Sequence, residues 1–161
     1  METSKYWVGI DVSKTQLDVA VRPSGEKFEV ANTEAGVAEL VQRLQPLSPE
    51  RIVLEATSGM EVQATVSLHE AGLAVVVVNP RQVREFAKAT GKLAKTDTID
   101  ANVLAHFAEA IHPELRPISD WQSRQLSELV TRRRQLVEML SAEKNRRAAS
   151  QGKMHQEIQA H

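Results

Sequence analysis

The sequence predicts an α/β fold, in which a mixed β-sheet carries flanking helices and one long helix follows. Three segments near the N-terminus have the apolar patterns of strands, and short turns separate them. Further along, short apolar runs alternate with segments whose apolar residues recur at helical spacing. That order of elements is typical of a mixed sheet covered by helices.

The first three strands are expected at residues 6–12, 16–21 and 27–31. The second of them places a Leu or Val at every other position, which is the period of a strand with one buried face. Residues 13–15 and 23–25 are short segments of turn-forming composition between the strands. Such short connections predict that the three strands are antiparallel neighbours.

Two short apolar runs, residues 51–55 and 73–78, are expected to be fully buried strands. The helix that precedes the first run opens at Asn32 and Thr33, residue types that are preferred as N-caps. Ser58 and Glu61 resemble a capping box, and this pair predicts the start of the helix between the two strands.

Glycine and proline predict where the next helices end and begin. Gly72 is expected to close the helix that precedes the second buried run, because glycine favours the position after a helix end. Asn79 and Pro80 form a good N-cap and first-turn pair for the following helix. A further helix is expected from Asp97 to about Ile111.

From Asp120 the chain reads as one long helix with an apolar stripe, whereas residues 150–161 show no clear pattern and are expected to fray. We therefore expect a domain of residues 1–118 and a helical extension of residues 119–161. The stripe can pack on the domain or pair with another chain as a short coiled coil, and Arg133 interrupts it. Its apolar positions are Leu126, Leu129, Val130, Leu136, Val137 and Leu140.

The composition excludes several classes of protein. The chain has no cysteine, which excludes disulfides and thiolate metal sites and predicts a reducing cytoplasm. Its longest apolar run, residues 73–78, is too short to span a membrane. An aromatic content of 4% argues against a base-stacking module, and a net charge of −1 means that any contact with nucleic acid must come from local basic patches.

Four acids occupy informative positions. Asp11 lies near the end of the first strand, and Glu55 ends the fourth. If these strands are neighbours, the two side chains face each other at the edge of the sheet where functional groups gather. Asp97 and Asp100 are three residues apart at the expected start of a helix, which places both on one helix face.

Clustered carboxylates repel one another, so a buried set requires cations. Mg²⁺ suits such a set, and two ions can stabilise both the attacking and the leaving oxygens of a phosphodiester reaction. Each acid also has a simpler interpretation. Asp11 can form a turn, Glu55 can pair with a basic residue, and Asp97 and Asp100 can cap a helix. Asp18, a fifth acid near Asp11, is expected to face solvent or to pair with a lysine, with an outer role at the site as the alternative.

Four segments, in order, resemble the signature segments of the DEDD transposases, the insertion-sequence enzymes related to the Piv-type DNA invertases. The resemblance extends over about residues 5–148. Because all four acids fall on the elements that this family uses for its metal site, their co-occurrence favours a metal site more strongly than any single acid does. The segments are residues 9–14 (GIDVSK), 54–59 (LEATSG), 79–83 (NPRQV) and 95–101 (KTDTIDA).

The resemblance implies a RuvC-like, ribonuclease H-like domain in which Asp11, Glu55, Asp97 and Asp100 coordinate Mg²⁺ or Mn²⁺, as two ions. It also implies DNA as substrate, a structured guide RNA as partner, assembly of a homo-oligomer through the long helix, and association with a bacterial nucleoid. Family members carry a second domain with a catalytic serine. The sequence stops at His161, so that domain is expected to be absent, and no serine here is assigned as the nucleophile.

Two basic segments are candidates for contacts with nucleic acid, because cationic side chains attract the phosphate backbone. Their alternative role is to keep an exposed helix or loop soluble. The first segment leads into Asp97, and the second lies on the long helix. The residues are Arg81, Arg84, Lys88, Lys92 and Lys95, and then Arg132, Arg133 and Arg134.

Two further functions remain open from the sequence. One is a phosphotransferase of the actin and sugar-kinase type, because residues 9–15 resemble the first phosphate loop of those proteins. It predicts a second phosphate loop and a glycine-rich adenosine site, and neither is visible. The other is a non-catalytic nucleic-acid-binding remnant, which differs from the transposase hypothesis only in metal binding and cleavage.

Overall fold

The computed structural model describes residues 4–91, 99–116 and 120–159, and within the last range it describes the side chains of residues 126–152. The chain divides into two compact units, Met1–Ser119 and Asp120–His161. The first unit contains the sheet and four α-helices among its described residues, and the second is one helix.

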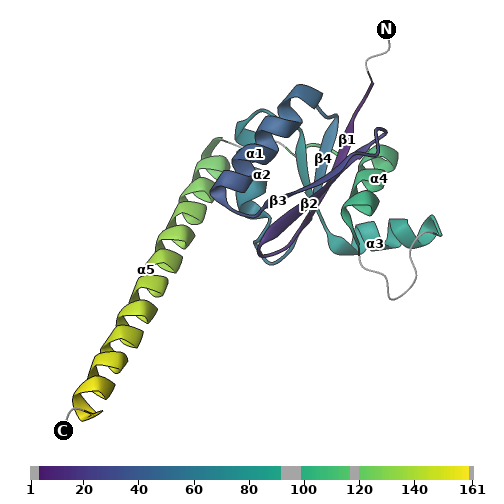
Figure 1. Ribbon diagram of the computed structural model, residues 1–161. Coiled ribbons are helices and arrows are strands. Elements are labelled where there is room, and N and C mark those ends of the chain that lie inside the picture. The colour runs from purple at the N-terminus through teal and green to yellow at the C-terminus, as the bar shows by residue number, and fades with distance from the viewer. Residues whose placement is uncertain (1–3, 92–98, 117–119, 160–161) are drawn as a thin grey trace. The chain divides into compact units, whose positions relative to one another are not determined.

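The sheet has five strands in the order β3-β2-β1-β4-β5. β1 pairs antiparallel with β2 and β2 antiparallel with β3, whereas β1, β4 and β5 run parallel. This order, with β2 as the one reversed strand, is a ribonuclease H-like arrangement, as the sequence predicted (Figure 1). The strands are β1 (Trp7–Val12), β2 (Gln16–Arg22), β3 (Lys27–Ala31), β4 (Arg51–Glu55) and β5 (Val75–Val78).

Helices cover both faces of the sheet (Figure 1). One face packs against α1 (Glu34–Leu44) and α2 (Val62–Glu70), and the short 3-10 helix η1 (Gln45–Leu47) follows α1. The other face packs against α3 (Pro80–Ala89) and α4 (Ala101–Ile111).

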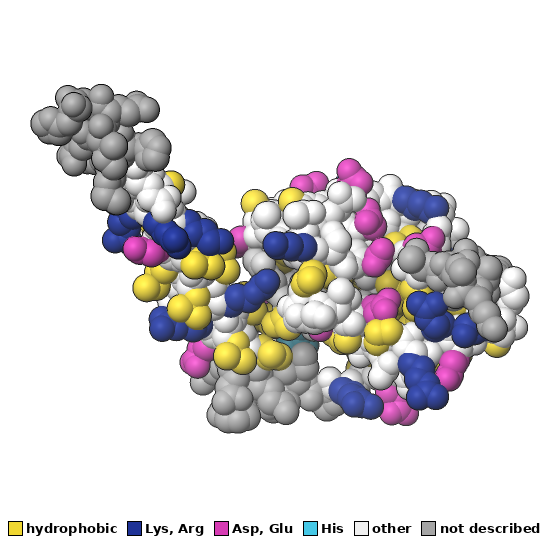
Figure 2. Space-filling model, turned by 90° about the horizontal axis from the view of Figure 1, so that it is seen from below, with side chains coloured by type: hydrophobic (Ala, Val, Ile, Leu, Met, Phe, Trp, Pro, Cys, Tyr) yellow, Lys and Arg dark blue, Asp and Glu magenta, His cyan; other side chains and the backbone are white. Residues whose placement is uncertain are grey.

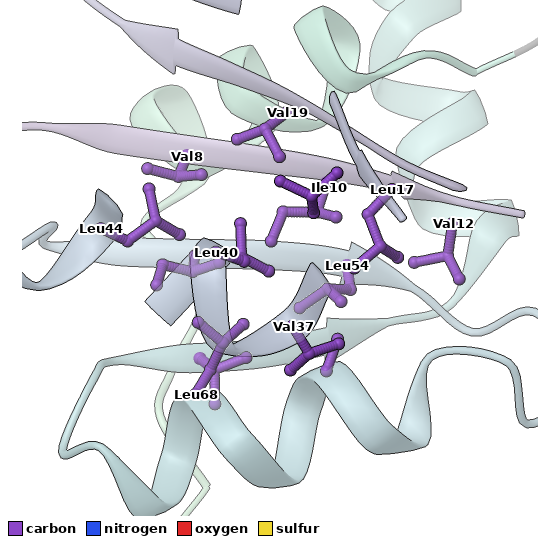
Figure 3. Packing of buried hydrophobic residues seen from close by; sticks show 14 of the residues in the cluster. Val8, Ile10, Val12, Leu17, Val19, Val37, Leu40, Leu44, Leu54 and Leu68 are labelled. Atoms are coloured by element: carbon purple, nitrogen blue, oxygen red, sulfur yellow. The ribbon is translucent and has the colours of Figure 1, made fainter. Parts of the chain in front are cut away.

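Aliphatic side chains fill the layer beneath α1 and α2. Figure 3 shows side chains from β1, β2 and β4 meeting those of the two helices in one cluster. Alternate residues of each strand enter this layer, as the period of two predicts. The intervening residues therefore face α3 and α4, and this second face carries the acids described below. Fully buried members of the cluster include Val8, Ile10, Leu17, Leu40, Leu54 and Leu68.

Helix ends mostly follow the predicted signals. Thr33 caps α1 by accepting a hydrogen bond from the Gly36 amide at 3.1 Å. Asn79 caps α3 in the same way, accepting from Arg81, with Pro80 in the first turn. Gly72 has a φ of 77° just after α2, a conformation that glycine adopts without steric cost.

The capping box predicted at Ser58 is wrong. Ser58 has a φ of 51°, and α2 begins at Val62, four residues later. Glu61 instead accepts a hydrogen bond from the Thr57 amide at 3.0 Å through its side chain, which closes the loop before the helix. The glutamate thus bonds an upstream amide as in a capping box, but the serine does not cap the helix.

Two other expectations need correction. β5 was expected to be fully buried, but it is the edge strand of the sheet, and Val77 is 39% exposed there. The helix expected from Asp97 begins at Ala101. Asp100 lies outside the helix as its N-cap, and Asp97 lies outside the described residues, so the expectation that both acids share one helix face is not tested.

The second unit is α5 (Asp120–Gln159), a single helix of 40 residues, as predicted from Asp120 onward. It continues well past residue 150, so the expected fraying is wrong for the backbone through Gln159. The predicted stripe is exposed at Leu129, Leu136 and Leu140. Figure 2 shows hydrophobic side chains interleaved with those of Lys and Arg along this helix.

Candidate functional site

Two acids meet at the ends of the parallel strands β1 and β4. The register pairs Ile10 with Leu54, so the next residues, Asp11 and Glu55, lie side by side. Both side chains alternate away from the α1 and α2 layer and belong to the face that α4 covers. The predicted juxtaposition of Asp11 with Glu55 is therefore present.

α4 lies unusually close to this face because β1 has a glycine beneath it. A Cβ built on Gly9 would lie 2.2 Å from the carbonyl oxygen of Ala101 and 2.3 Å from the amide nitrogen of Ala105. Gly9 is two residues before Asp11 on the same face of the strand. The glycine thus lets the first turns of α4 pack directly on β1, beside the acids.

Asp100 brings a third carboxylate to the site from the start of α4. One of its oxygens, Oδ1, accepts a hydrogen bond from the Val103 amide at 2.9 Å, which is the N-cap interaction. The charge of Asp100 also acts on Asp11, where it helps to raise the pKa. The capping role and the proximity to Asp11 occur together, so the two sequence interpretations of this residue are compatible.

Asp18 belongs to the same cluster, which sequence reasoning recognised only as an alternative. The β1–β2 register places Asp18 directly opposite Asp11. Gln16 holds it by donating to Asp18 at 2.7 Å and to Glu29 at 2.8 Å from one amide nitrogen. In the structure the Ser13 amide donates to the Gln16 carbonyl at 2.9 Å, so the turn has two residues and residue 11 pairs with residue 18. The three-residue turn expected at residues 13–15 would have paired residue 11 with residue 17 instead.

A hollow of about 480 Å³ lies beside these acids. Four carboxylates, the Asn102 amide and the Lys27 amine make up its polar lining. The polar lining residues are Asp11, Asp18, Lys27, Glu29, Asp100 and Asn102.

Burial and like charges raise the pKa of both central acids. For Asp11 the largest cause is burial, followed by the negative charges of Asp18 and Asp100, and a hydrogen bond from the Val12 amide opposes them. For Glu55 the causes are burial and then the charge of Asp11, and the positive charge of Arg84 opposes them. The site therefore carries electrostatic repulsion that a cation would relieve.

Part of the predicted site lies outside the described residues. Asp97, Lys92 and Lys95 fall in residues 92–98, which the structure does not describe. In the part of the chain that it does describe, no group of three or more His, Asp or Glu residues is close enough to hold a metal ion. Metal binding by the full set of four acids accordingly remains a prediction.

The described basic residues of the first segment lie on α3. Arg84 is half-buried and acts on Glu55 through its charge, so it belongs to the neighbourhood of the site. Arg81 is exposed and forms an ion pair with Glu85 at 3.2 Å, and Lys88 is exposed at the last turn. Residues 132–134 are exposed on α5, as a nucleic-acid contact or a solubilising face requires.

Two histidines near the site have partners of another kind. His106 meets the ring of Phe86 edge-on at 5.0 Å, and His112 stacks on Trp7 at 4.4 Å. These aromatic contacts give both residues a role in packing.

Fold and site together define a class: a ribonuclease H-like domain with carboxylates at the ends of β1 and β4 and at the start of α4. A family model for transposases, DEDD_Tnp_IS110, matches residues 8–150. The chain belongs to this DEDD transposase family, which confirms the resemblance of its signature segments.

Particular relatives extend the comparison. The pilin gene-inverting proteins of Moraxella lacunata and Moraxella bovis are each 28% identical over 156 residues, which cover 91% of this chain and 47% of the relative. The chain thus spans about half the length of these curated relatives. Among solved structures, RuvC of T. thermophilus in complex with a Holliday junction substrate aligns with a TM-score of 0.45 and 17% identity, covering 76% of this chain and 88% of RuvC.

No helix in the described ranges has both the length and the apolar character needed to cross a membrane.

Proposed function

We propose that this chain is the metal-dependent catalytic domain of a DNA transposase or recombinase, which cleaves and exchanges DNA strands. The observation that carries the proposal is the pairing of Asp11 with Glu55 at the ends of adjacent parallel strands, facing the start of α4. Family membership and the relationship to gene-inverting proteins support DNA as the substrate.

The residues of the site fit a hard divalent cation. Every acidic donor there is a carboxylate oxygen, the ligand type that Mg²⁺ and Mn²⁺ prefer. Asp11, Glu55 and Asp100 would hold the metal together with Asp97, which we propose to be two ions, and the described acids would have to move closer together to do so. When bound, the metal would activate a nucleophile and stabilise charge on a phosphodiester.

The chain's own cations would orient the DNA. Arg84 lies near Glu55, and a guanidinium can contact a phosphate through two hydrogen bonds. Lys88 and Arg81 continue the basic surface along α3, and Lys92 and Lys95 follow in sequence. We infer that these residues guide a phosphate backbone toward the carboxylates, where repulsion would otherwise keep it away.

The remaining parts of the proposal concern the whole protein. We infer that a further domain supplies the serine nucleophile, that a structured RNA guides the choice of DNA, and that the protein acts at the nucleoid. The exposed stripe on α5 supports a homo-oligomer built through that helix, because exposed Leu136, Val137 and Leu140 would be buried by a second helix. Arg132, Arg133 and Arg134 would then contact RNA or DNA.

Thermal unfolding with and without Mn²⁺ tests the metal site. A ligand of the native state at one hundred times its Kd adds about 2.7 kcal/mol, which raises the Tm by several degrees. We expect this rise in the wild type and in Glu39→Gln, a control on the opposite face, and no rise in Asp11→Ala. An unchanged wild-type Tm at saturating Mn²⁺ would instead support a non-catalytic nucleic-acid-binding domain.

Family membership also decides against the phosphotransferase of the actin and sugar-kinase type. The transposase match covers residues 8–150, which include the segment that resembled a phosphate loop. The same segment supplies Asp11 to the carboxylate site. The glycine in it is explained by the close packing of α4 on Gly9.

A further inference from the structure

We propose that Asn32 is a positioning residue that sets the spacing between Asp11 and Glu55 by clamping together the two loops that follow these acids. The inference rests on the proposed metal site, since the spacing of the two carboxylates matters there. Asn32 lies at the junction of β3 and α1, immediately before the N-cap Thr33, and it is half-buried.

One amide group of Asn32 bonds both loops. Its Nδ2 donates to the carbonyl oxygen of Ser13 at 2.8 Å, in the turn between β1 and β2. The same Nδ2 donates to the carbonyl oxygen of Met60 at 3.3 Å, in the loop between β4 and α2. The backbone amide of Asn32 adds a third bond, to the carbonyl oxygen of Thr15 at 2.9 Å.

Short paths of bonds connect this amide to the two acids. Ser13 follows Asp11 by two residues, so the first path runs along the covalent backbone. On the other side, the Met60 amide donates to the Thr57 carbonyl at 3.0 Å, and the Thr57 hydroxyl donates to the Glu55 carbonyl at 3.1 Å. Movement of either loop therefore changes the distance between the backbones that carry the carboxylates.

Asn32 joins the two loops at the point where the carboxylates of Asp11 and Glu55 repel each other. Burial, and after it the charge of Asp11, raises the pKa of Glu55, so the two acids repel each other. β1 and β4 are bonded directly only up to Ile10 and Leu54, so the loops beyond them need another connection. A primary amide supplies two hydrogens to two carbonyls, whereas an aspartate has none to give. This requirement explains an asparagine at the position.

Mn²⁺ affinity, measured by titration of the metal-free protein, separates positioning from stability. Removal of an outer group that orients metal ligands typically weakens metal binding by about 10–100-fold. We expect Asn32→Ala to weaken Mn²⁺ binding by about tenfold or more. The matched control is Thr33→Ala, which removes the adjacent helix cap and costs roughly 0.5–2 kcal/mol of stability but leaves both loop contacts intact. Its Mn²⁺ affinity should equal that of the wild type.

The outcomes are distinct. If the wild type binds Mn²⁺ and Asn32→Ala binds it equally well, the positioning role is refuted while the proposed function stands. The role is also refuted if Thr33→Ala weakens binding as much, because the effect is then one of stability. If the wild type itself does not bind Mn²⁺, the proposed function is refuted, and the positioning role of Asn32 is refuted with it.

A second variant covers the case in which the alanine substitution prevents folding. The hydroxyl of Asn32→Ser has a single hydrogen and can serve at most one of the two carbonyls. We expect its Mn²⁺ affinity to be weaker than that of the wild type at a stability close to that of Thr33→Ala. Wild-type affinity in this variant would overturn the proposal.

Discussion

Replacing Gly9 by alanine should damage the site through the position of α4. The new Cβ would lie 2.2 Å from the Ala101 carbonyl oxygen, whereas ordinary contact begins at 3.4 Å. The difference, about 1.2 Å, is the distance by which the helix must retreat from β1. Both nearest atoms belong to the backbone of α4, so a change of side-chain rotamer cannot relieve the clash.

Two consequences of that movement can be given magnitudes. Overpacking of a core typically costs about 1–3 kcal/mol, and we expect Gly9→Ala to reach the upper part of that range. Asp100 begins α4 and would move with it, away from Asp11. Since displacements of about 1 Å in a site can reduce function by roughly 100-fold, we expect a clear loss of Mn²⁺ affinity.

Denaturant unfolding and Mn²⁺ titration would measure these effects separately. Leu40→Ala is the control, because Leu40 is fully buried in the α1 layer on the opposite face, and such truncations cost about 2–5 kcal/mol. It should lower stability and keep Mn²⁺ affinity. Gly9→Ala with unchanged stability and affinity would show that α4 does not approach β1 as closely as described.

Two further predictions concern charge and assembly. In metal-free protein, Asp11→Asn should be more stable than the wild type at pH 7. The pKa of Asp11 in the folded state lies above its ordinary value, so the wild type loses stability as the pH rises through that pKa. The difference between the two unfolding midpoints should therefore vanish below about pH 4, and midpoints that still differ there would contradict the prediction. Leu136→Asp should lower the oligomer mass measured by light scattering, because it places a charge in the apolar stripe of α5. Glu138→Gln is the control and should keep the wild-type mass. An unchanged mass in Leu136→Asp would exclude this stripe as the interface.

Local signals predicted much of the fold. An apolar run identified the first strand and a period-two pattern the second, and the short turns predicted the antiparallel order of the first three strands. Thr33, Asn79 and Gly72 marked helix ends because their interactions are with the nearest backbone groups. The pairing of Asp11 with Glu55 was predictable only on the condition that β1 and β4 are neighbours, which is a tertiary fact.

Features that depend on distant residues were missed. Ser58 had the sequence of a cap, but the loop that Thr57 and Glu61 close places it outside the helix. The clamp by Asn32 joins residues far apart in the chain, so no local pattern indicated it. The exposure of Val77 follows from strand order, since an edge strand and a central strand can have the same apolar sequence.

The hydrogen bond that caps α4 links the carboxylate cluster to a backbone amide whose hydrogen exchange can be measured. Oδ1 of Asp100 is engaged by the Val103 amide, which leaves Oδ2 to face other partners. Any ligand drawn to that second oxygen fixes the carboxylate and thereby slows the opening of the first helical turn. Hydrogen exchange at one backbone amide, that of Val103, should therefore register occupancy of the carboxylate cluster without any label placed in it.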